Sequence, residues 1–171
     1  MSYFSRLISS IEDRAPGVAP RDDPFFEFDF RLHADPSKIT GPHWFELVPG
    51  PPPEAKCRLP GSRFINEFTF CLIEGIFEQY AASYDHFSYG EVSSSQWKMI
   101  VADLATLRAA LVKAGENAKV ALPYGGTLRV QTDFEQNWAT NQGQLASLLF
   151  SLDQWLRETL AVNDSISVLG L

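Results

Sequence analysis

Proline is distributed very unevenly along this chain of 171 residues, and this distribution constrains the fold more than any other feature. Ten of the 11 prolines lie at or before Pro60, and the last is Pro123. Proline interrupts helices because it lacks a backbone N–H and its ring clashes with the preceding turn. We therefore expect turns, short strands and extended segments in the first third, with a proline-rich loop at about 33–61, and long helices only beyond it.

The first third nevertheless contains three segments with regular patterns. Apolar residues recur at helical spacing over residues 3–11, which predicts a short amphipathic helix. From Phe26 to Leu32, apolar and charged residues alternate strictly, which predicts a half-exposed strand with one apolar and one charged face. Residues 43–48 lie between two prolines and predict a second strand.

Residues 62–83 are apolar around most of the circumference of a helix, which predicts one long helix at the centre of the core. The remaining positions of that helix form a single narrow stripe of Glu67, Cys71, Glu74 and Glu78. A solvated stripe on an otherwise buried helix is the simpler interpretation of these residues. An acidic surface that binds a partner is the alternative.

The clearest helix signal follows in the second half of the chain. Ser93 and Gln96 form a capping box, an apolar face runs from Trp97 to Leu111, and Gly115 suits the end of the helix. Because this pattern combines a start, a face and a stop, it predicts the bounds of the helix as well as its existence.

Three more elements complete the predicted fold. Residues 120–122 and 128–130 flank a turn that contains two glycines and predict a hairpin. A helix is expected over residues 141–161, and the alternation in residues 165–169 predicts a strand that joins the sheet. Helices and strands are mixed without a βαβ rhythm, so the predicted class is α+β, with a mainly antiparallel sheet packed against about four helices.

Composition indicates one domain over residues 1–171 and a soluble setting. Hydrophobic residues make up 45% of the chain, enough for one sizeable core. Acidic residues outnumber basic ones by 21 to 14, a formal net charge of −7, which argues against nucleic acid or an anionic membrane as partner. Two cysteines are too few for a disulfide framework, and the first residues lack a signal-peptide pattern. We therefore expect a cytoplasmic protein.

No catalytic or metal-binding motif stands out in the sequence. The three histidines, His33, His43 and His86, lack the close spacing of metal ligands, so we expect no metal and no cofactor. Cys71 is expected to have a raised pKa and low reactivity beside the glutamates of its stripe. A non-enzymatic function follows, with an enzyme or a small-ligand site in the His33–His43 loop as an alternative.

The carboxylates indicate where a partner could bind. Those around the first predicted strand leave a largely acidic outward face, which favours a basic partner. The loop of residues 84–91 adds aromatic and polar side chains typical of binding surfaces, although the same aromatic residues could instead fill the core beneath the loop. The candidate partner-binding residues are Asp22, Asp23, Glu27, Asp29, Glu67, Glu74, Glu78, Tyr84, His86 and Tyr89.

Two segments of the second half carry a family resemblance. Tyr89-Gly90-Glu91-Val92-Ser93 leads into Gln96-Trp97 and the capped helix, and the helix around Trp155 is followed by Ile166-Ser167-Val168-Leu169-Gly170. In these segments, and in being small, acidic and aromatic-rich, the chain resembles cytosolic immunity proteins of bacterial polymorphic-toxin systems of the contact-dependent or type VI kind. The resemblance implies a protein that covers the active site of a cognate toxin and performs no chemistry. The expected partner is a basic secreted toxin, and an acidic chaperone of secreted effectors is the alternative function.

Overall fold

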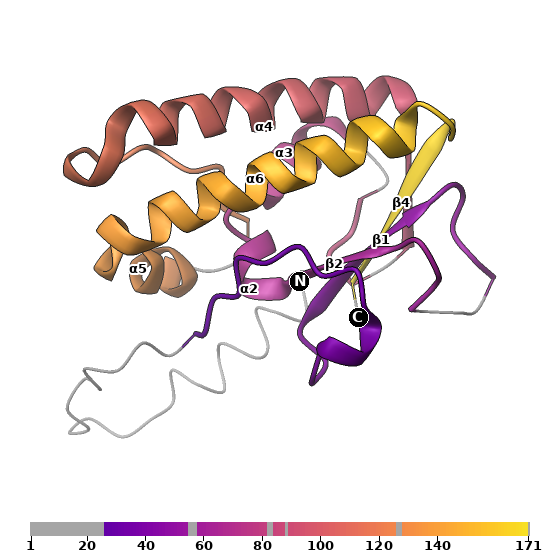
Figure 1. The fold of residues 1–171 in the computed structure, drawn as a ribbon, viewed down its shortest axis with the longest axis horizontal. Coiled ribbons are helices and arrows are strands. Elements are labelled where there is room, and N and C mark those ends of the chain that lie inside the picture. The colour runs from indigo at the N-terminus through magenta and orange to yellow at the C-terminus, as the bar shows by residue number, and fades with distance from the viewer. Residues whose placement is uncertain (1–25, 55–57, 82–83, 88, 126–127, 171) are drawn as a thin grey trace.

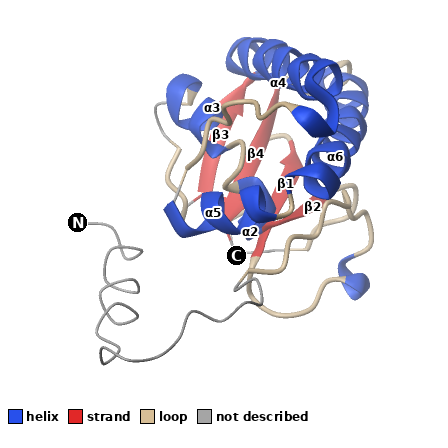
Figure 2. Cartoon of the chain, turned by 90° about the vertical axis from the view of Figure 1, so that its left-hand side faces the viewer, coloured by secondary structure: helices blue, strands red, loops and turns tan. Residues whose placement is uncertain are grey.

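The computed structural model describes residues 26–54, 58–81, 84–87, 89–125 and 128–170. These residues form a four-stranded antiparallel sheet with the helices gathered on one side of it (Figures 1 and 2). The architecture confirms the α+β class predicted from the sequence.

The sheet has the strand order β2-β1-β4-β3, so the strand nearest the C-terminus lies inside it. Its members are β1 (Trp44–Pro49), β2 (Arg63–Asn66), β3 (Tyr89–Ser93) and β4 (Ser165–Gly170). Phe45 and Leu47 of β1 and Val168 of β4 belong to the main hydrophobic core. The strands predicted at residues 43–48 and 165–169 are therefore confirmed.

Two long helices form most of the layer that covers the sheet. The helices are α2 (Glu67–Phe70), α3 (Glu74–Tyr80), α4 (Ser94–Ala114), α5 (Leu128–Gln136) and α6 (Trp138–Leu160), with short 3₁₀ turns at Pro36–Lys38 and Gly115–Asn117. Helices α4 and α6 lie side by side (Figure 1). The capping box of Ser93 and Gln96 is present, the predicted apolar face of α4 is buried, and Gly115 has a positive φ of 59°. Both long helices are thus confirmed.

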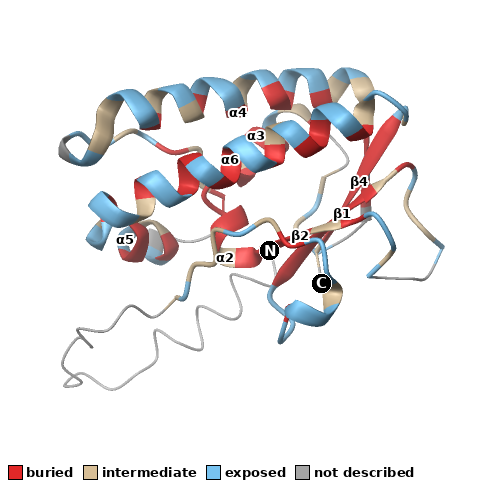
Figure 3. Cartoon of the chain, viewed as in Figure 1, coloured by how far each residue is buried: buried red, intermediate tan, exposed pale blue. Residues whose placement is uncertain are grey.

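Loops cover the other face of the sheet, which explains why β1 and β4 are buried on both sides (Figure 3). Ile39, Trp44 and Phe64 form a small second core there. The buried carboxylate of Glu46 accepts hydrogen bonds from the backbone N–H groups of Arg58 and Leu59, at 2.6 and 2.7 Å. A carboxylate can be buried at this position because those backbone donors replace water.

The single helix predicted for residues 62–83 is wrong. The segment instead forms strand β2 and two short helices, α2 and α3. Asn66 ends the strand and begins α2, since its side chain accepts a hydrogen bond from the backbone N–H of Thr69 at 3.2 Å. Phe64 and Ile65 are buried in β2, opposite residues of β1. An unbroken apolar run is compatible with either a buried strand or a buried helix, so periodicity alone could not separate the two.

The strand predicted for residues 26–32 is also wrong, although its alternation is real. Phe28 and Phe30 are half-buried and pack against Phe134 of α5, with ring centroids 5.8 and 6.2 Å apart. The backbone joins the sheet only at His33, through an isolated bridge to Phe64. Phe26, Phe28 and Phe30 therefore lie outside the four strands of the sheet.

The hairpin at residues 120–130 and the loop at residues 84–91 are corrected as well. Residues 118–125 contain no strand and lie against α2 and α3, where the Gly125 N–H donates to the Cys71 carbonyl and the Gly75 N–H to the Pro123 carbonyl. Leu128 already begins α5. The last three residues of the predicted loop belong to strand β3. The helix predicted at residues 3–11 lies outside the described residues, as does Cys57.

Candidate functional site

A cleft of about 880 Å³ opens between the extended segment of residues 27–31 and the first half of α6. Residues 27–31 form one part of its lining, and the rest comes from Thr40, His43, Trp44, Asn66, Phe68 and, on α6, Thr140, Gly143, Gln144 and Ser147. The cleft thus joins parts of the chain that are more than 100 residues apart, and it combines aromatic rings with charged side chains.

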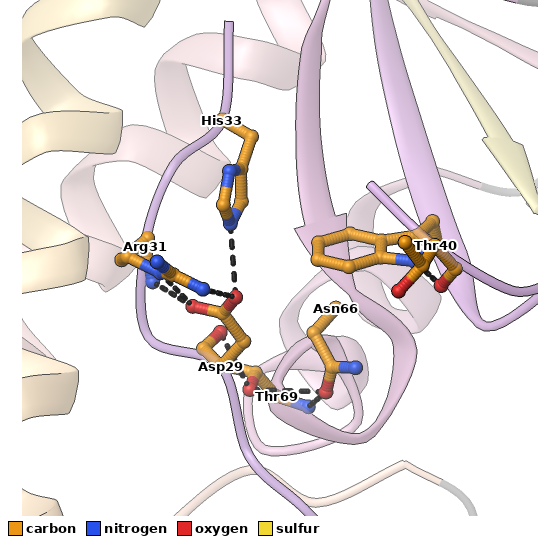
Figure 4. A network of polar contacts seen from close by, with 7 residues as sticks. Asp29, Arg31, His33, Thr40, Asn66 and Thr69 are labelled. Atoms are coloured by element: carbon orange, nitrogen blue, oxygen red, sulfur yellow. Dashed lines mark hydrogen bonds and ion pairs between the residues drawn. The ribbon is translucent and has the colours of Figure 1, made fainter. Parts of the chain in front are cut away.

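Asp29 organises one wall of the cleft (Figure 4). The Arg31 side chain donates to both of its carboxylate oxygens, from Nε at 2.8 Å and from Nη2 at 2.6 Å. Buried His33 places its Nε2 2.9 Å from the same carboxylate. Burial would raise the pKa of Asp29, but the hydrogen bonds from Arg31 and His33 outweigh it and hold the pKa at about 2. Asp29 is therefore ionised and fixed in position.

Aromatic residues also line the cleft. The Trp44 ring is edge-on to His33, with centroids 5.2 Å apart, and its Nε1–H donates to the Thr40 carbonyl at 2.9 Å. The Phe68 ring lies 5.3 Å from the His43 ring. Rings held in this way offer rigid apolar surface to a ligand at little cost in conformational entropy.

His43 connects the cleft to a chain of buried ionisable groups. Its side chain is 57% exposed, and its Nδ1 lies 2.8 Å from Oε2 of Glu67. The other oxygen of Glu67 lies 3.1 Å from Nε2 of His86, and Nδ1 of His86 lies 2.5 Å from Oε1 of Glu74. Tyr84 donates its hydroxyl to the same Glu74 oxygen at 2.6 Å. We refer to Glu67, Glu74, Tyr84 and His86 as the buried network.

Electrostatics hold the buried network in one charge state. Burial lowers the pKa of His86, but its hydrogen bonds to Glu67 and Glu74 and their charges outweigh this effect and raise the pKa to about 9. Burial raises the pKa of Glu67, and the hydrogen bonds from His86 and His43 overcome it, so that this pKa is lowered. His86 is consequently an imidazolium at neutral pH, and both of its ring nitrogens donate to carboxylates.

Helix starts and two close glycines position the network. Glu67 and Glu74 occupy the first turns of α2 and α3, where the helix dipole favours a carboxylate. A side chain at Gly125 would strike the Glu74 side chain, and one at Gly170 would strike the His86 carbonyl oxygen. Only glycine therefore allows these backbones to approach the network so closely.

The structure places the predicted site residues in different environments. Glu27 and Asp29 line the cleft, whereas Glu67, Glu74, Tyr84 and His86 meet in the buried network. The last two glutamates of the predicted stripe differ, because Glu74 is buried and Glu78 is exposed. Neither the solvated stripe nor an outward acidic face is correct for Glu67 and Glu74, which bind histidines inside the protein. Tyr89 begins β3, and Asp22 and Asp23 lie outside the described residues.

The sequence grouped His33 and His43 in one loop as an alternative small-ligand site; in the structure His43 lines the cleft, whereas His33 lies behind it and binds Asp29. The sequence also placed Cys71 beside the glutamates of its stripe. Burial together with the charges of Glu74 and Glu67 raises the pKa of Cys71, as predicted. The available signal for its position was the Glu67–Cys71–Glu74 spacing. Nothing in the sequence brought His86 to that group, because this contact depends on the tertiary fold.

No protein-family model, curated protein or solved structure matches this chain. None of the helices in the described part of the chain has both the length and the apolar character required to cross a bilayer.

Proposed function

We propose that this chain is a non-enzymatic binding protein whose cleft receives a basic segment of a protein partner. The observation that carries the proposal is the combination of carboxylates and aromatic rings in one cleft. Glu27 and Asp29 line the cleft together with Phe28 and Phe30. A lysine or arginine side chain is recognised by this combination, because carboxylates pair with its charge and aromatic faces attract it.

The arrangement around Asp29 supports a guanidinium as the preferred group. Arg31 already binds its carboxylate through two parallel hydrogen bonds, yet the Arg31 side chain is 77% exposed. An arginine of a partner can therefore exchange with Arg31 or bind next to it at exposed Glu27. The volume of the cleft accommodates several residues of a partner segment rather than a single side chain.

In this proposal the partner is a toxin and the protein acts in the cytoplasm. The resemblance to immunity proteins of polymorphic-toxin systems supports the choice of a toxin, and the net charge of −7 favours association with a basic protein. The protein would inhibit by covering the toxin surface, which requires no chemistry of its own.

Affinity purification of the full chain from its native host tests this proposal. Three forms are compared: wild type, Glu27→Lys in the cleft, and Glu158→Lys, an equal charge change on the exposed part of α6 outside the cleft. We expect one protein to co-purify with wild type and Glu158→Lys and to be depleted with Glu27→Lys. Its expression alone should stop growth, and co-expression of wild type should restore it. A co-purifying protein that is harmless, or that binds all three forms equally, would contradict the proposal.

A second candidate, an acid–base enzyme, is favoured by one observation. Glu67 holds Nδ1 of His43, and the described residues give Nε2 of this exposed ring no hydrogen-bond partner. A histidine oriented by a carboxylate at the edge of a cleft is a typical general base. Turnover of chromogenic ester, phosphoester or glycoside substrates that disappears in His43→Ala would support this candidate, and the absence of any His43-dependent turnover would remove it.

A further inference from the structure

Cys71 lies next to two members of the buried network, Glu74 and His86, so that three different metal-binding side chains meet. Cys71 follows α2, Glu74 begins α3, and His86 precedes β3. The thiol sulfur, a carboxylate oxygen and an imidazole nitrogen of these residues lie within 4.8 Å of one another. Cys71 and Glu74 are buried, and the His86 side chain is only 14% exposed. Thiolate, imidazole and carboxylate are the protein ligands that Zn²⁺ uses.

Glu74 offers an independent indication of a missing partner. Its side chain is 2% exposed, and none of the residues that the structure describes gives its Oε2 atom a hydrogen bond. A buried carboxylate oxygen without a partner is costly, because it has lost its water and gained nothing in exchange. Coordination to a cation would satisfy this atom.

We propose that Cys71, Glu74 and His86 bind one zinc ion. Zn²⁺ takes the place of two protons, one on the Cys71 thiol and one on Nδ1 of His86, so both protons are released to solvent. Two carboxylates and one imidazolium give the network a charge of −1 without the ion. Three anionic groups, a neutral imidazole and Zn²⁺ give −1 with it. Occupation of the site therefore leaves the buried charge unchanged.

The surrounding groups are suited to a zinc ligand set. Tetrahedral zinc keeps neighbouring donor atoms roughly 3.3–3.6 Å apart. The donors are already within 4.8 Å, and His86 Nδ1 and Glu74 Oε1, now 2.5 Å apart, must separate by roughly 0.8–1.1 Å when the ion replaces the proton between them. Nε2 of His86 keeps its proton and its contact with Glu67, which gives the carboxylate–histidine–metal arrangement common at zinc sites.

The site would join the turn between α2 and α3 to the segment before β3, and its three protein ligands would leave the fourth position of a tetrahedral zinc ion to water. It shares no residue with the part of the cleft, Glu27 and Asp29, that is proposed to bind the partner. The two proposals can therefore fail separately.

Cobalt titration of the untagged, metal-free full chain tests the site. One equivalent of Co²⁺ should produce a thiolate-to-cobalt charge-transfer band, and one equivalent of Zn²⁺ should abolish the band and raise the thermal midpoint of unfolding. Cys71→Ser should lose the band, whereas Cys57→Ser, which changes the only other cysteine, should keep it. Glu67→Gln should keep the band and weaken affinity about 10–100-fold, because it removes the outer carboxylate and no ligand.

Circular dichroism would show whether a variant fails to fold. The titration of wild type tests the zinc site without any variant. A wild-type protein that shows neither the band nor a change in thermal midpoint with Zn²⁺ would overturn the proposal. A band that survives Cys71→Ser and is lost in Cys57→Ser would overturn it equally.

Discussion

Replacing Glu67 by glutamine should destabilise the protein far more than the same change at Glu78. The two residues belong to the one acidic stripe visible in the sequence, but Glu67 is buried and Glu78 is exposed. Glu67→Gln leaves the imidazolium of His86 with one carboxylate instead of two. A hydrogen bond to a charged group contributes about 1.5–3 kcal/mol, and the bond to the exposed His43 adds no more than about 0.5 kcal/mol.

We therefore expect Glu67→Gln to lower the free energy of unfolding by about 2–3 kcal/mol, and Glu78→Gln to change it by no more than about 0.5 kcal/mol in either direction. Urea denaturation followed by far-UV circular dichroism at neutral pH, with a chelator present to keep the protein metal-free, measures both. Equal and small effects would refute the reasoning, because they would mean that both glutamates are solvated and that no buried network exists.

Three further predictions concern the core, the close glycines and acid stability. Phe77→Ala should lower the free energy of unfolding by about 3–5 kcal/mol, because Phe77 is fully buried. Phe68→Ala should lower it by less than half as much, because Phe68 is half-buried in the cleft. Chemical denaturation of both variants measures the two effects. Gly170→Ala should destabilise the protein by about 1–3 kcal/mol, since the added methyl group would strike the His86 carbonyl oxygen. Gly143→Ala lies in open space within α6 and should stabilise the protein by about 0.5–1 kcal/mol. A fall in the thermal midpoint of both variants would contradict this prediction. The pKa of Asp29 is about 2 in the folded protein and near 3.8 when unperturbed. Its ionised form therefore stabilises the fold above pH 3.8, and this contribution disappears as the pH falls towards 2. The free energy of unfolding of Asp29→Asn should accordingly depend less on pH between 3.8 and 2 than that of wild type.

Local signals in the sequence predicted the elements whose patterns are self-contained. The helix that begins after Ser93 has its cap, its apolar face and its terminal glycine within one short segment, and α4 has all three. Residues 165–169 alternate between two buried faces of a central strand and were predicted correctly. Where start and stop signals were weak, as in residues 62–83, the apolar run was assigned to the wrong element, because burial on every side removes the periodicity that distinguishes strand from helix.

The candidate site was less accessible from the sequence because it depends on long-range contacts. Glu27 and Asp29 were chosen for their charge, and both line the cleft. Glu67 and Glu74 were chosen for the same reason, yet the fold buries them with His86, which arrives from a segment between α3 and β3. No local pattern could show that contact, since it joins residues that are 12 and 19 positions apart in the sequence.

The association rate with the captured partner, measured against salt concentration, tests the central claim most directly. Only Glu27 should be reversed for this purpose, because Asp29 also holds Arg31 and His33 in place. Long-range attraction between an acidic cleft and a basic segment speeds association and is screened by salt. We predict that the rate constant of wild type and of Glu158→Lys falls several-fold between low and physiological salt, and that Glu27→Lys binds several-fold more slowly at low salt. A rate constant that responds neither to salt nor to Glu27→Lys would contradict recognition of a basic partner in the cleft.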